Sequence, residues 1–309
     1  MTVSASARKA LPGAAELRRE AATVRVGVEP GAPITSYIAA GRDWCADAWR
    51  DFGPTRAGCV LPTYVSGAGG TAFPEGGLLA ADVPSVQVRA DGKLGVITAQ
   101  WPQTGYPLDW VRTVALDKDG SLLAQYRVHN MHDTTLPFVW GIPIPLPWDR
   151  SVAIDLPRGA RGRVAWSVGR GLAASGSEFT WPSVRDGGRL IDLTQPTQLA
   201  QRSALLCFVE LADGRFTVRA GKMTLEISGD SDVLTHARLH IVHDADLPGA
   251  PARRWWRRHR PMKTITIGPA AGAPDSLSDA VGSWRSAQWL EPGATMVWTV
   301  RYRANPRSS

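Results

Sequence analysis

One short stretch of the 309-residue sequence, 239-LHIVHDAD-246, brings an imidazole together with two carboxylates. A carboxylate near a histidine raises the pKa of the imidazole and orients it, so the pair can transfer protons as acid and base. Successive residues of a strand point to opposite sides, so His243 is better placed to work with Asp246 than with Asp244. The competing interpretation is a turn at the end of a strand, stabilised by the aspartate side chains.

A second stretch, 253-RRWWRRHR-260, holds five arginines in a chain with 35 basic and 28 acidic residues, so much of the net charge of +7 is local. Guanidinium groups bind phosphate or carboxylate in a bidentate manner, which makes Arg257 a candidate anion contact. The alternative is a solvated hairpin. A nucleic-acid-binding protein normally has a broader basic face and a recognisable module. Neither occurs, so we expect no nucleic-acid partner.

The remaining histidines carry weaker signals. His129 and His132 flank Asn130 and are expected at the surface in a turn. His236 and His240 alternate along a strand and are expected to point to solvent.

The sequence contains no pattern typical of a metal or cofactor site. Cys45, Cys59 and Cys207 are too few and too scattered for a disulfide framework, and no CxxC or Cys/His ligand spacing occurs. We therefore expect no metal, no organic cofactor and a reducing, cytoplasmic compartment. The first residues lack the apolar segment of a secretory signal. No apolar run approaches the ~20 residues needed to cross a bilayer, so we expect no membrane association.

The elements that must position these residues are predicted to be strands almost throughout. Runs with alternating apolar and polar residues are separated by turn signals such as ADG, KDG and GD, which are typical of hairpins. The runs begin at residues 23, 84, 94, 110, 121, 163, 204, 215, 222, 237, 263 and 296. This pattern predicts an all-β protein, a large antiparallel β-sandwich of two sheets packed face to face.

Helical pattern is confined to residues 13–22 and 275–282, where Asp275 or Ser276 could cap a helix start. No change of composition divides the chain. We expect a polar lead-in over 1–22, one domain over 23–303 and a short tail over 304–309.

The segment 136-LPFVWGIPIPLPW-148 contains four prolines, at positions 137, 143, 145 and 147. Proline cannot donate to a strand ladder, so this segment cannot be a central strand. It is predicted to be an irregular loop or a sheet edge, and irregular backbone on a rigid sheet is where sites are often built.

Four segments together resemble the aldose 1-epimerase (galactose mutarotase-like) family. They span most of residues 23–303: 30-PGAPITSYIAAGRDW-44, 73-FPEGGL-78, 120-GSLLAQYRVHNMHDTTLPFVWGIPIP-145, and 264-TITIGPAAGAPDSLSDAV-281 with 289-WLEPGATMVWTVRY-302. The resemblance implies the large β-sandwich of that family, the galactose mutarotase-like supersandwich. Members interconvert sugar anomers with one carboxylate and usually two histidines, which act as base and acid on one C–O bond.

This chain departs from the family at the residues that carry the chemistry. The family's glutamate, before a proline at the end of a late strand, falls on Gly268. Its first histidine falls on Gly76, and its second on Pro143 or Ile144. None of these side chains can transfer a proton.

Two other carboxylates lie near the matched segments. Glu75 is the nearest to a lost histidine position and is the replacement to consider if the alignment slips by one residue. Glu291, in WLEPG, is expected to belong to the turn before the last strand and not to the site.

The resemblance also suggests which residues would surround a ligand. His243 ends a strand of the kind that delivers polar residues to the family's sugar cleft. Tyr64, Trp140 and Trp181 lie in segments that would line the cleft, where an aromatic face can stack on a sugar ring. The competing interpretation of each tryptophan is core packing.

Three functions remain open. The first is a mutarotase-like protein with a cleft for a sugar or sugar-like small molecule and without aldose 1-epimerase activity. The second is a repurposed enzyme, an isomerase, cyclase or lyase of secondary metabolism, acting on a larger apolar ligand through His243 and nearby carboxylates. The third, an active epimerase with other catalytic residues, ranks last. A small-molecule ligand is the expected partner, and the chain is expected to be a monomer or a homodimer.

Overall fold

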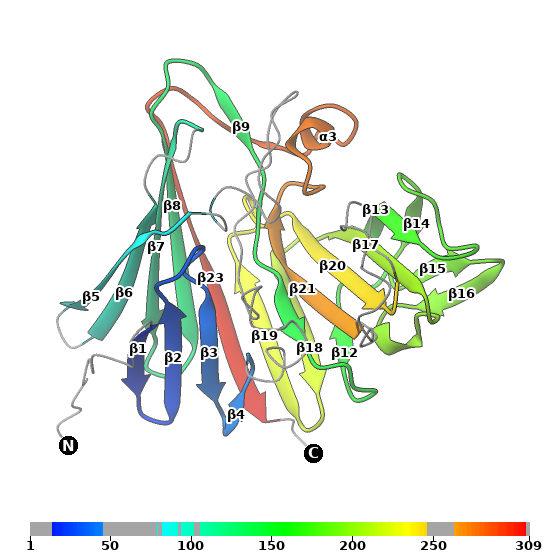
Figure 1. The fold of residues 1–309 in the computed structure, drawn as a ribbon, viewed down its shortest axis with the longest axis horizontal. Helices are drawn as coiled ribbons and strands as arrows, with labels where there is room; N and C mark the ends of the chain where they lie inside the picture. The colour runs from blue at the N-terminus through cyan, green and yellow to red at the C-terminus, as the bar shows by residue number, and fades with distance from the viewer. Residues whose placement is uncertain are drawn as a thin grey trace, which may run out of the picture.

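The computed structural model describes residues 14–45, 79, 82–91, 94–101, 106–245 and 263–306. Within these residues nearly every element is a strand, and the all-β prediction is confirmed (Figure 1). Each of the twelve predicted runs has a strand at its place. The strands form two large antiparallel sheets and two small ones.

The first large sheet has eight strands in the described residues, and most of them pair with a sequence neighbour. Their spatial order is β12 (Ala153–Asp155), β18 (Arg215–Ala220), β19 (Met223–Gly229), β23 (Thr295–Pro306), β8 (Leu122–Asn130), β7 (Leu108–Leu116), β6 (Leu94–Trp101) and β5 (Ser85–Asp91). On its long strands buried and more exposed residues alternate, as β7 illustrates with Trp110 and Val114 inside and Thr113 between them.

The second large sheet has nine described strands and carries the candidate site. Its order is β10 (Trp140–Gly141), β21 (Lys263–Ala271), β20 (His236–His243), β17 (Ser203–Glu210), β13 (Arg161–Val168), β14 (Glu178–Thr180), β15 (Ser183–Asp186) and β16 (Arg189–Asp192), with β11 (Ile144–Leu146) also on β21. The proline-rich segment therefore forms short edge strands, as its prolines require.

Two small sheets complete the described strands. One contains β1 (Ala14–Arg19), β2 (Ala22–Gly27), β3 (Ile34–Ala39) and β4 (Arg42–Asp43). The other pairs β22 (Gln288–Leu290) with β9 (Leu136–Phe138). The short helices are η2 (Pro196–Gln198) and α3 (Leu277–Val281).

One large hydrophobic core takes inward-facing residues from both large sheets. It contains a group of five aromatic rings whose contacting centroids lie 4.6 to 6.3 Å apart: Trp110, Tyr126, Phe138, Trp140 and Trp298. Aromatic side chains bury large apolar areas and prefer the stacked and edge-to-face contacts found in this group. The core therefore explains several of the 13 tryptophans.

Two predictions about local structure are wrong. Residues 14–19 form β1 instead of a helix, because they pair with β2 through a tight turn in which Glu20 adopts a positive φ of 50°. Pairing with β2 and the burial of Leu17 outweigh local helix propensity here.

The second wrong prediction concerns two turns. The turns at 212–214 and 229–230 are not hairpins, because each links a strand of one large sheet to a strand of the other. The KDG turn between β7 and β8 does form a hairpin.

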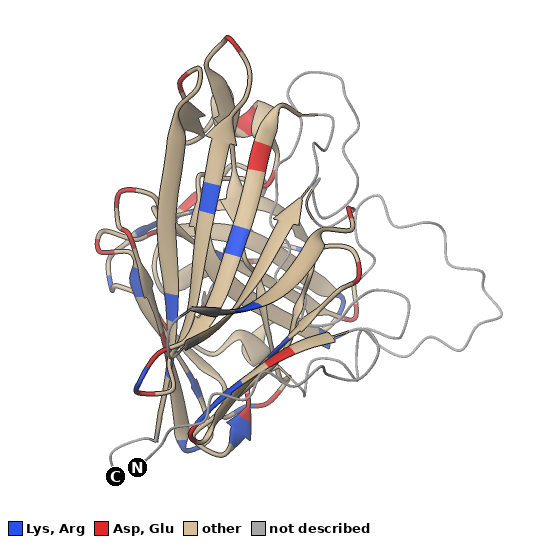
Figure 2. Cartoon of the chain, turned by 90° about the vertical axis from the view of Figure 1, so that its left-hand side faces the viewer, with Lys and Arg blue, Asp and Glu red and all other residues tan. Residues whose placement is uncertain are grey.

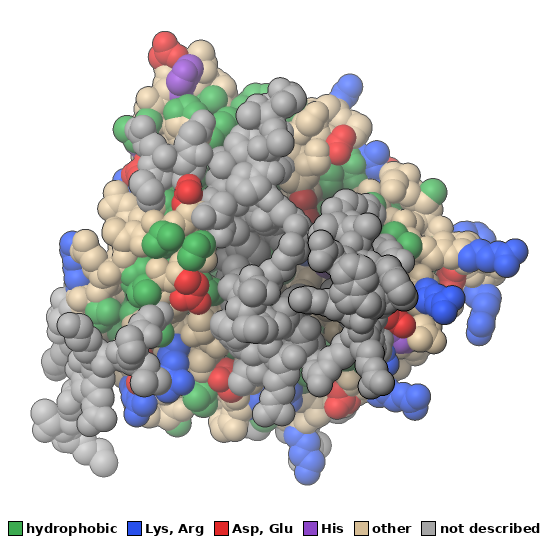
Figure 3. Space-filling view, in the orientation of Figure 1, with side chains coloured by type: hydrophobic (Ala, Val, Ile, Leu, Met, Phe, Trp, Pro, Cys, Tyr) green, Lys and Arg blue, Asp and Glu red, His purple; other side chains and the backbone are tan. Residues whose placement is uncertain are grey.

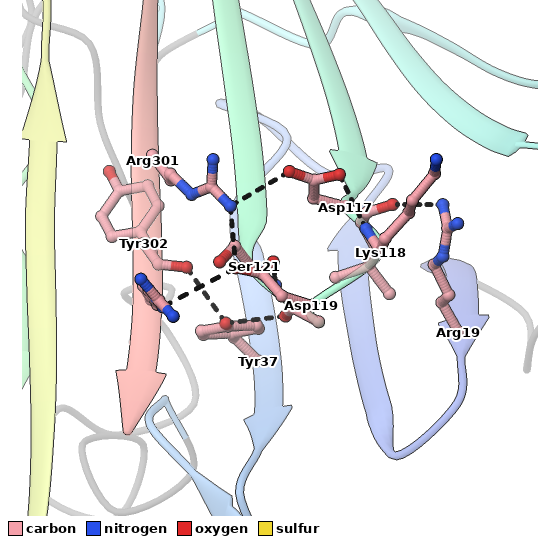
Figure 4. A network of polar contacts seen from close by, with 11 residues as sticks. Arg19, Tyr37, Asp117, Lys118, Asp119, Ser121, Arg301 and Tyr302 are labelled. Atoms are coloured by element: carbon pink, nitrogen blue, oxygen red, sulfur yellow. Dashed lines mark hydrogen bonds and ion pairs between the residues drawn. The ribbon is translucent and has the colours of Figure 1, made fainter.

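Polar contacts at the β7–β8 hairpin attach the N-terminal sheet to the eight-stranded sheet (Figure 4). The hydroxyl of Tyr37 on β3 lies within hydrogen-bond distance of the carbonyl oxygens of Gly120 (3.0 Å) and Tyr302 (3.1 Å). Beside it, the guanidinium of Arg301 bridges Asp117 (3.0 Å) and Asp119 (2.8 Å).

The Asp119 contacts predict an acid-sensitive contribution to stability. Partial burial raises the pKa of Asp119, but hydrogen bonds from the Ser121 amide and from Arg301, with the charge of Arg301, outweigh it and lower the pKa from 3.8 to about 2. A carboxyl whose pKa is lowered by folding stabilises the protein above its ordinary pKa, and this stability is lost as the pH falls through the folded-state value. We expect wild type to exceed Asp119→Asn in urea midpoint near pH 6, with the difference shrinking below pH 4 and gone near pH 2.

The exposed Asp133, whose side chain is 90% accessible, provides the control. Asp133→Asn should change the urea midpoint little at any of these pH values. A wild-type advantage over Asp119→Asn that stayed constant from pH 6 to pH 2 would contradict the assignment.

Candidate functional site

Main-chain atoms of a neighbouring segment occupy the space in which a side chain at position 268 would lie; this arrangement is called the closure of position 268. On β21, residues 270–271 pair with β10 and residues 265–267 pair with β11, so the link Ile142–Pro143 between these strands lies opposite Gly268 and Pro269. The Ile142 amide donates to the Pro269 carbonyl (3.1 Å), which holds this link against β21. A Cβ atom built at Gly268 would lie 1.5 Å from the Ile142 oxygen. Glycine stands here because a carbonyl group occupies the place of a side chain.

The face of the nine-stranded sheet that turns away from the large core is named the outer face. Alternate residues of β20 define it: Ala237, Leu239 and Ile241 belong to the large core, whereas His236, Arg238 and His240 point the other way. The ladder places Arg238 opposite Gly268 on one side and Phe208 on the other. Position 268 and the polar residues of β20 therefore share one face.

A buried ion pair crosses this face. The side chain of Arg238 is 7% accessible, and its Nε and Nη2 atoms donate to the two carboxylate oxygens of Asp275 at 2.7 to 3.0 Å. Asp275 immediately precedes the N-cap of α3, where Ser276 accepts from the Asp279 amide. The bidentate geometry fixes the start of α3 against the sheet.

Two buried polar atoms beside this ion pair have no hydrogen-bond partner among the described residues. They are Nε2 of His240 and Oγ1 of Thr266, which are ladder partners on β20 and β21. Burial, with a smaller effect of the Arg238 charge, lowers the pKa of His240 to about 3, so its imidazole is neutral near pH 7. A neutral imidazole and a hydroxyl can both exchange hydrogen bonds with a hydroxyl-bearing ligand.

An open hollow of about 790 Å³ lies where β17 ends and β13 and β20 begin, next to the loop that follows α3. In Figure 1 this is the end of the sheet nearest α3. Its apolar wall includes Phe208 and Trp284, whose rings meet edge to face at 5.8 Å. The volume lies within the range of small-molecule sites.

The polar residues of the hollow are mostly basic. Arg158, Arg161, Arg163 and Arg285 line it, with Glu210 as the carboxylate among its described lining residues. His236 is the ladder partner of Glu210, and burial lowers the pKa of His236 to about 4. An efficient general acid needs a pKa near the working pH, so neither His236 nor His240 meets that requirement near pH 7.

Comparison with the solved structures of other proteins identifies the fold. A protein from Synechocystis sp. PCC 6803 is 14% identical, with a TM-score of 0.67 over 99% of this chain and 100% of its own. A galactose mutarotase related enzyme from Lactobacillus acidophilus is 17% identical, with a TM-score of 0.56 over 96% and 99%. A galactose mutarotase-like protein from Clostridium acetobutylicum is 10% identical, with a TM-score of 0.57 over 95% of each chain. The chain has the galactose mutarotase-like fold.

The resemblance in the sequence is thus confirmed at the level of fold, for a divergent chain. No protein-family model and no curated protein sequence matches it. Because the identities are low, the similarity to galactose mutarotase-like proteins describes the architecture and leaves the activity to be argued from the site.

Of the predicted pair His243 and Asp244, the histidine lies away from the outer face and the aspartate lies beyond the end of β20. His243 lies on the same side of β20 as the core residues, its Nδ1 is 2.7 Å from the Leu199 carbonyl oxygen, and its ring centroid is 4.8 Å from that of Trp148. Asp244 adopts a positive φ of 57° in the turn after β20 and accepts from Gln201 at 3.2 Å. An acid/base role for this pair stays a prediction.

The predicted aromatic contacts lie in the interior. Trp140 is 1% exposed and Trp181 is 2% exposed, and both belong to the large core. Their role in ligand binding stays a prediction, and in this structure they pack between other apolar side chains. Tyr64, Glu75, Asp246 and Arg257 lie outside the described residues, as does Gly76.

The other sequence expectations have mixed outcomes. Glu291 lies in the turn before β23, where it accepts from Thr135 at 2.7 Å, as predicted. Pro143 and Ile144 occupy the edge segment, and neither can transfer a proton. The expectation that His236 and His240 point to solvent is wrong, because both are partly buried on the outer face, where the ring of His236 packs against Phe208 and that of His240 against Trp166.

Sequence reasoning missed the row of polar side chains, His236, Arg238 and His240, that β20 places on the outer face. The pattern HARLH, with polar residues at every second position of an otherwise apolar strand, was the available signal. Asp275 and Trp284 meet this row only through the loops around α3, which no local pattern predicts. Among the described residues there is no cluster of His, Cys, Asp or Glu suited to a metal ion, and no helix long and apolar enough to span a bilayer.

Proposed function

We propose that this chain binds a sugar or sugar-like ligand on the outer face and does not interconvert sugar anomers. The observation that carries the proposal is the closure of position 268 by the Ile142 carbonyl. An anomerase needs a base and an acid held on opposite sides of one C–O bond. The position that the resemblance assigns to the base holds main chain, and the described outer-face imidazoles are held neutral by burial.

The proposal that the chain binds a sugar is supported by the hollow and by the polar groups of the outer face. The hollow has an aromatic wall at Trp284 and polar groups around it. Further along the same face, outside the lining of the hollow, His240 and Thr266 have buried hydrogen-bonding atoms that no described residue uses. A concave surface with an aromatic platform and a few convergent polar groups is the usual composition of a carbohydrate-sized site.

A first experiment separates binding from catalysis. Polarimetry of freshly dissolved D-glucose and D-galactose is expected to show mutarotation at the rate of buffer alone. Thermal unfolding in the presence of a panel of sugars and sugar derivatives is expected to show stabilisation by at least one of them, because a ligand that binds only the folded state raises the melting temperature. Accelerated mutarotation would refute the proposal.

A matched pair of tryptophan variants locates the site. Trp284→Ala should lose most of the ligand-induced rise in melting temperature, measured against its own ligand-free protein. Trp289→Ala, on β22 with a 53% exposed side chain outside the hollow, should keep it. Equal ligand-induced rises in the two variants would place the ligand elsewhere.

The second candidate, an enzyme acting through His243, remains an alternative. His243→Ala is the variant that tests it, since that enzyme would lose turnover while its fold is kept. The contacts of His243 with Leu199 and Trp148 give it a packing role on the core side of β20.

A further inference from the structure

We propose that the hollow at the α3 end of the nine-stranded sheet selects an anionic ligand, a sugar derivative that carries a carboxylate or a phosphate group. This inference rests on the proposed function and specifies its ligand class. It follows from the charges around the hollow and from how each of them is paired.

The residues that line the hollow carry more positive than negative charge. Four arginines line it, whereas Glu210 is the one acidic residue among its described lining residues. Arg161 takes both nearby carboxylates, because it contacts Glu178 at 2.5 Å and Glu210 at 3.9 Å. Arg158, Arg163 and Arg285 have no carboxylate within salt-bridge distance in the described parts of the chain. Among the described residues, three arginines that line one hollow therefore have no carboxylate within salt-bridge distance, although Arg163 is still attracted by the charge of Glu178.

Arg163 is held in place for binding. Its guanidinium lies 4.4 Å from the centroid of the Trp284 ring, its Nε donates to the Gly176 carbonyl (3.3 Å), and its Nη1 donates to the Ser283 carbonyl (3.2 Å). Among the described residues its Nη2 donates to no acceptor. A guanidinium that is fixed before binding loses little freedom when it pairs with an anion.

Arg285 and Arg158 approach from two other segments. Arg285 follows Trp284 in the loop after α3, where it adopts a positive φ of 52°. Few residues other than glycine adopt this conformation, which sets the direction of the side chain in the loop. Arg158 lies in the turn before β13. Guanidinium groups from three segments around an aromatic wall match a ligand with a sugar ring and a carboxylate or phosphate group.

Figure 3 shows that basic side chains also gather at the end of the molecule where β14, β15 and β16 lie. On the side seen in Figure 2, basic and acidic residues are instead scattered among uncharged ones. Positive charge at one end of the sheet would raise the local concentration of an anion near the hollow.

The test measures the binding of three probes, D-glucose, D-glucuronate and D-glucose 6-phosphate, to the full chain by isothermal titration calorimetry. We expect at least one of the two anions to bind about tenfold or more tightly than glucose, because a hydrogen bond to a charged group contributes more than a neutral one. Arg158→Gln and Arg285→Gln, both at exposed positions, should each reduce this preference, and high salt should reduce it further. The control Arg89→Gln removes an exposed arginine of β5, in the other large sheet, and should leave the preference unchanged.

The outcomes separate the two proposals. Binding of glucose and both anions with equal affinity would refute anion selection and leave sugar binding intact. An anion preference that survives both Arg158→Gln and Arg285→Gln would also refute it, since the anion would then bind elsewhere. No binding of any probe would refute anion selection, and with no stabilisation across the sugar panel it would refute the proposed function as well.

Discussion

Gly268→Ala is expected to lower the free energy of unfolding by about 3 kcal/mol, at the upper end of the usual cost of overpacking a core. The added Cβ would lie 1.5 Å from the Ile142 oxygen and 3.2 Å from the Pro143 Cα. Both are main-chain atoms of a segment that is hydrogen-bonded to β21, so no flexible side chain can move aside. Urea unfolding followed by tryptophan fluorescence measures the change.

The neighbouring Gly141 provides the matched control. A Cβ there would meet the Ala270 Cβ at 3.5 Å and the Pro269 oxygen at 3.6 Å, which are ordinary van der Waals distances. Neither glycine is among those with a positive φ, so the comparison isolates steric closure from conformational freedom. Gly141→Ala should change the free energy of unfolding by less than about 1 kcal/mol. Equal stability of the two variants would contradict the closure.

The same closure predicts the fate of a restored carboxylate. Gly268→Glu should be destabilised at least as much as Gly268→Ala and should not accelerate mutarotation, because the Glu side chain has no space on the outer face without displacing Ile142. A stable Gly268→Glu protein that interconverts glucose anomers would show that the scaffold still holds an epimerase site, and the proposed function would be wrong.

The sequence predicts the fold far better than the site, for a physical reason. A strand leaves a local signal, because burial on one face imposes a period of two, and each of the twelve predicted runs has its strand. The closure of position 268 depends on Ile142, 126 positions earlier in the chain, and the partner of Arg238 lies beyond β21. Contacts of this kind depend on pairing between distant segments, and local patterns contain no information on that pairing.

Burial explains why the surroundings of individual residues are hard to predict from the sequence. Trp140 and His240 both lie on strands of the nine-stranded sheet, yet the tryptophan points into the large core and the histidine to the outer face. The outer face of this sheet is itself largely buried, as the burial of Leu206 and Phe208 shows. When both faces of a strand are covered, the sequence no longer alternates regularly between apolar and polar residues. A polar residue in such a strand is then easily predicted to face solvent although it is partly buried.

Arg238→Met is expected to destabilise the protein by about 3 kcal/mol, because it removes one partner of a buried, bidentate ion pair. The remaining carboxylate, Asp275, has a side chain that is 27% accessible and lies at the start of α3. The exposed pair of Arg127 and Asp109 is the control, since the Arg127 side chain is 44% accessible and its contact is 3.2 Å long. Arg127→Met should cost less than about 1 kcal/mol.

A double-mutant cycle shows whether the cost comes from the pair itself. In Arg238→Met combined with Asp275→Leu neither charge remains, and replacing both partners of a buried pair by apolar residues often restores much of the stability. We therefore expect the double variant to be more stable than the sum of the two single changes implies, by at least about 1 kcal/mol in urea unfolding. Additive costs would mean that the two side chains act separately. The ion pair would then no longer explain how α3, and with it the loop that carries Trp284 and Arg285, is held over the outer face.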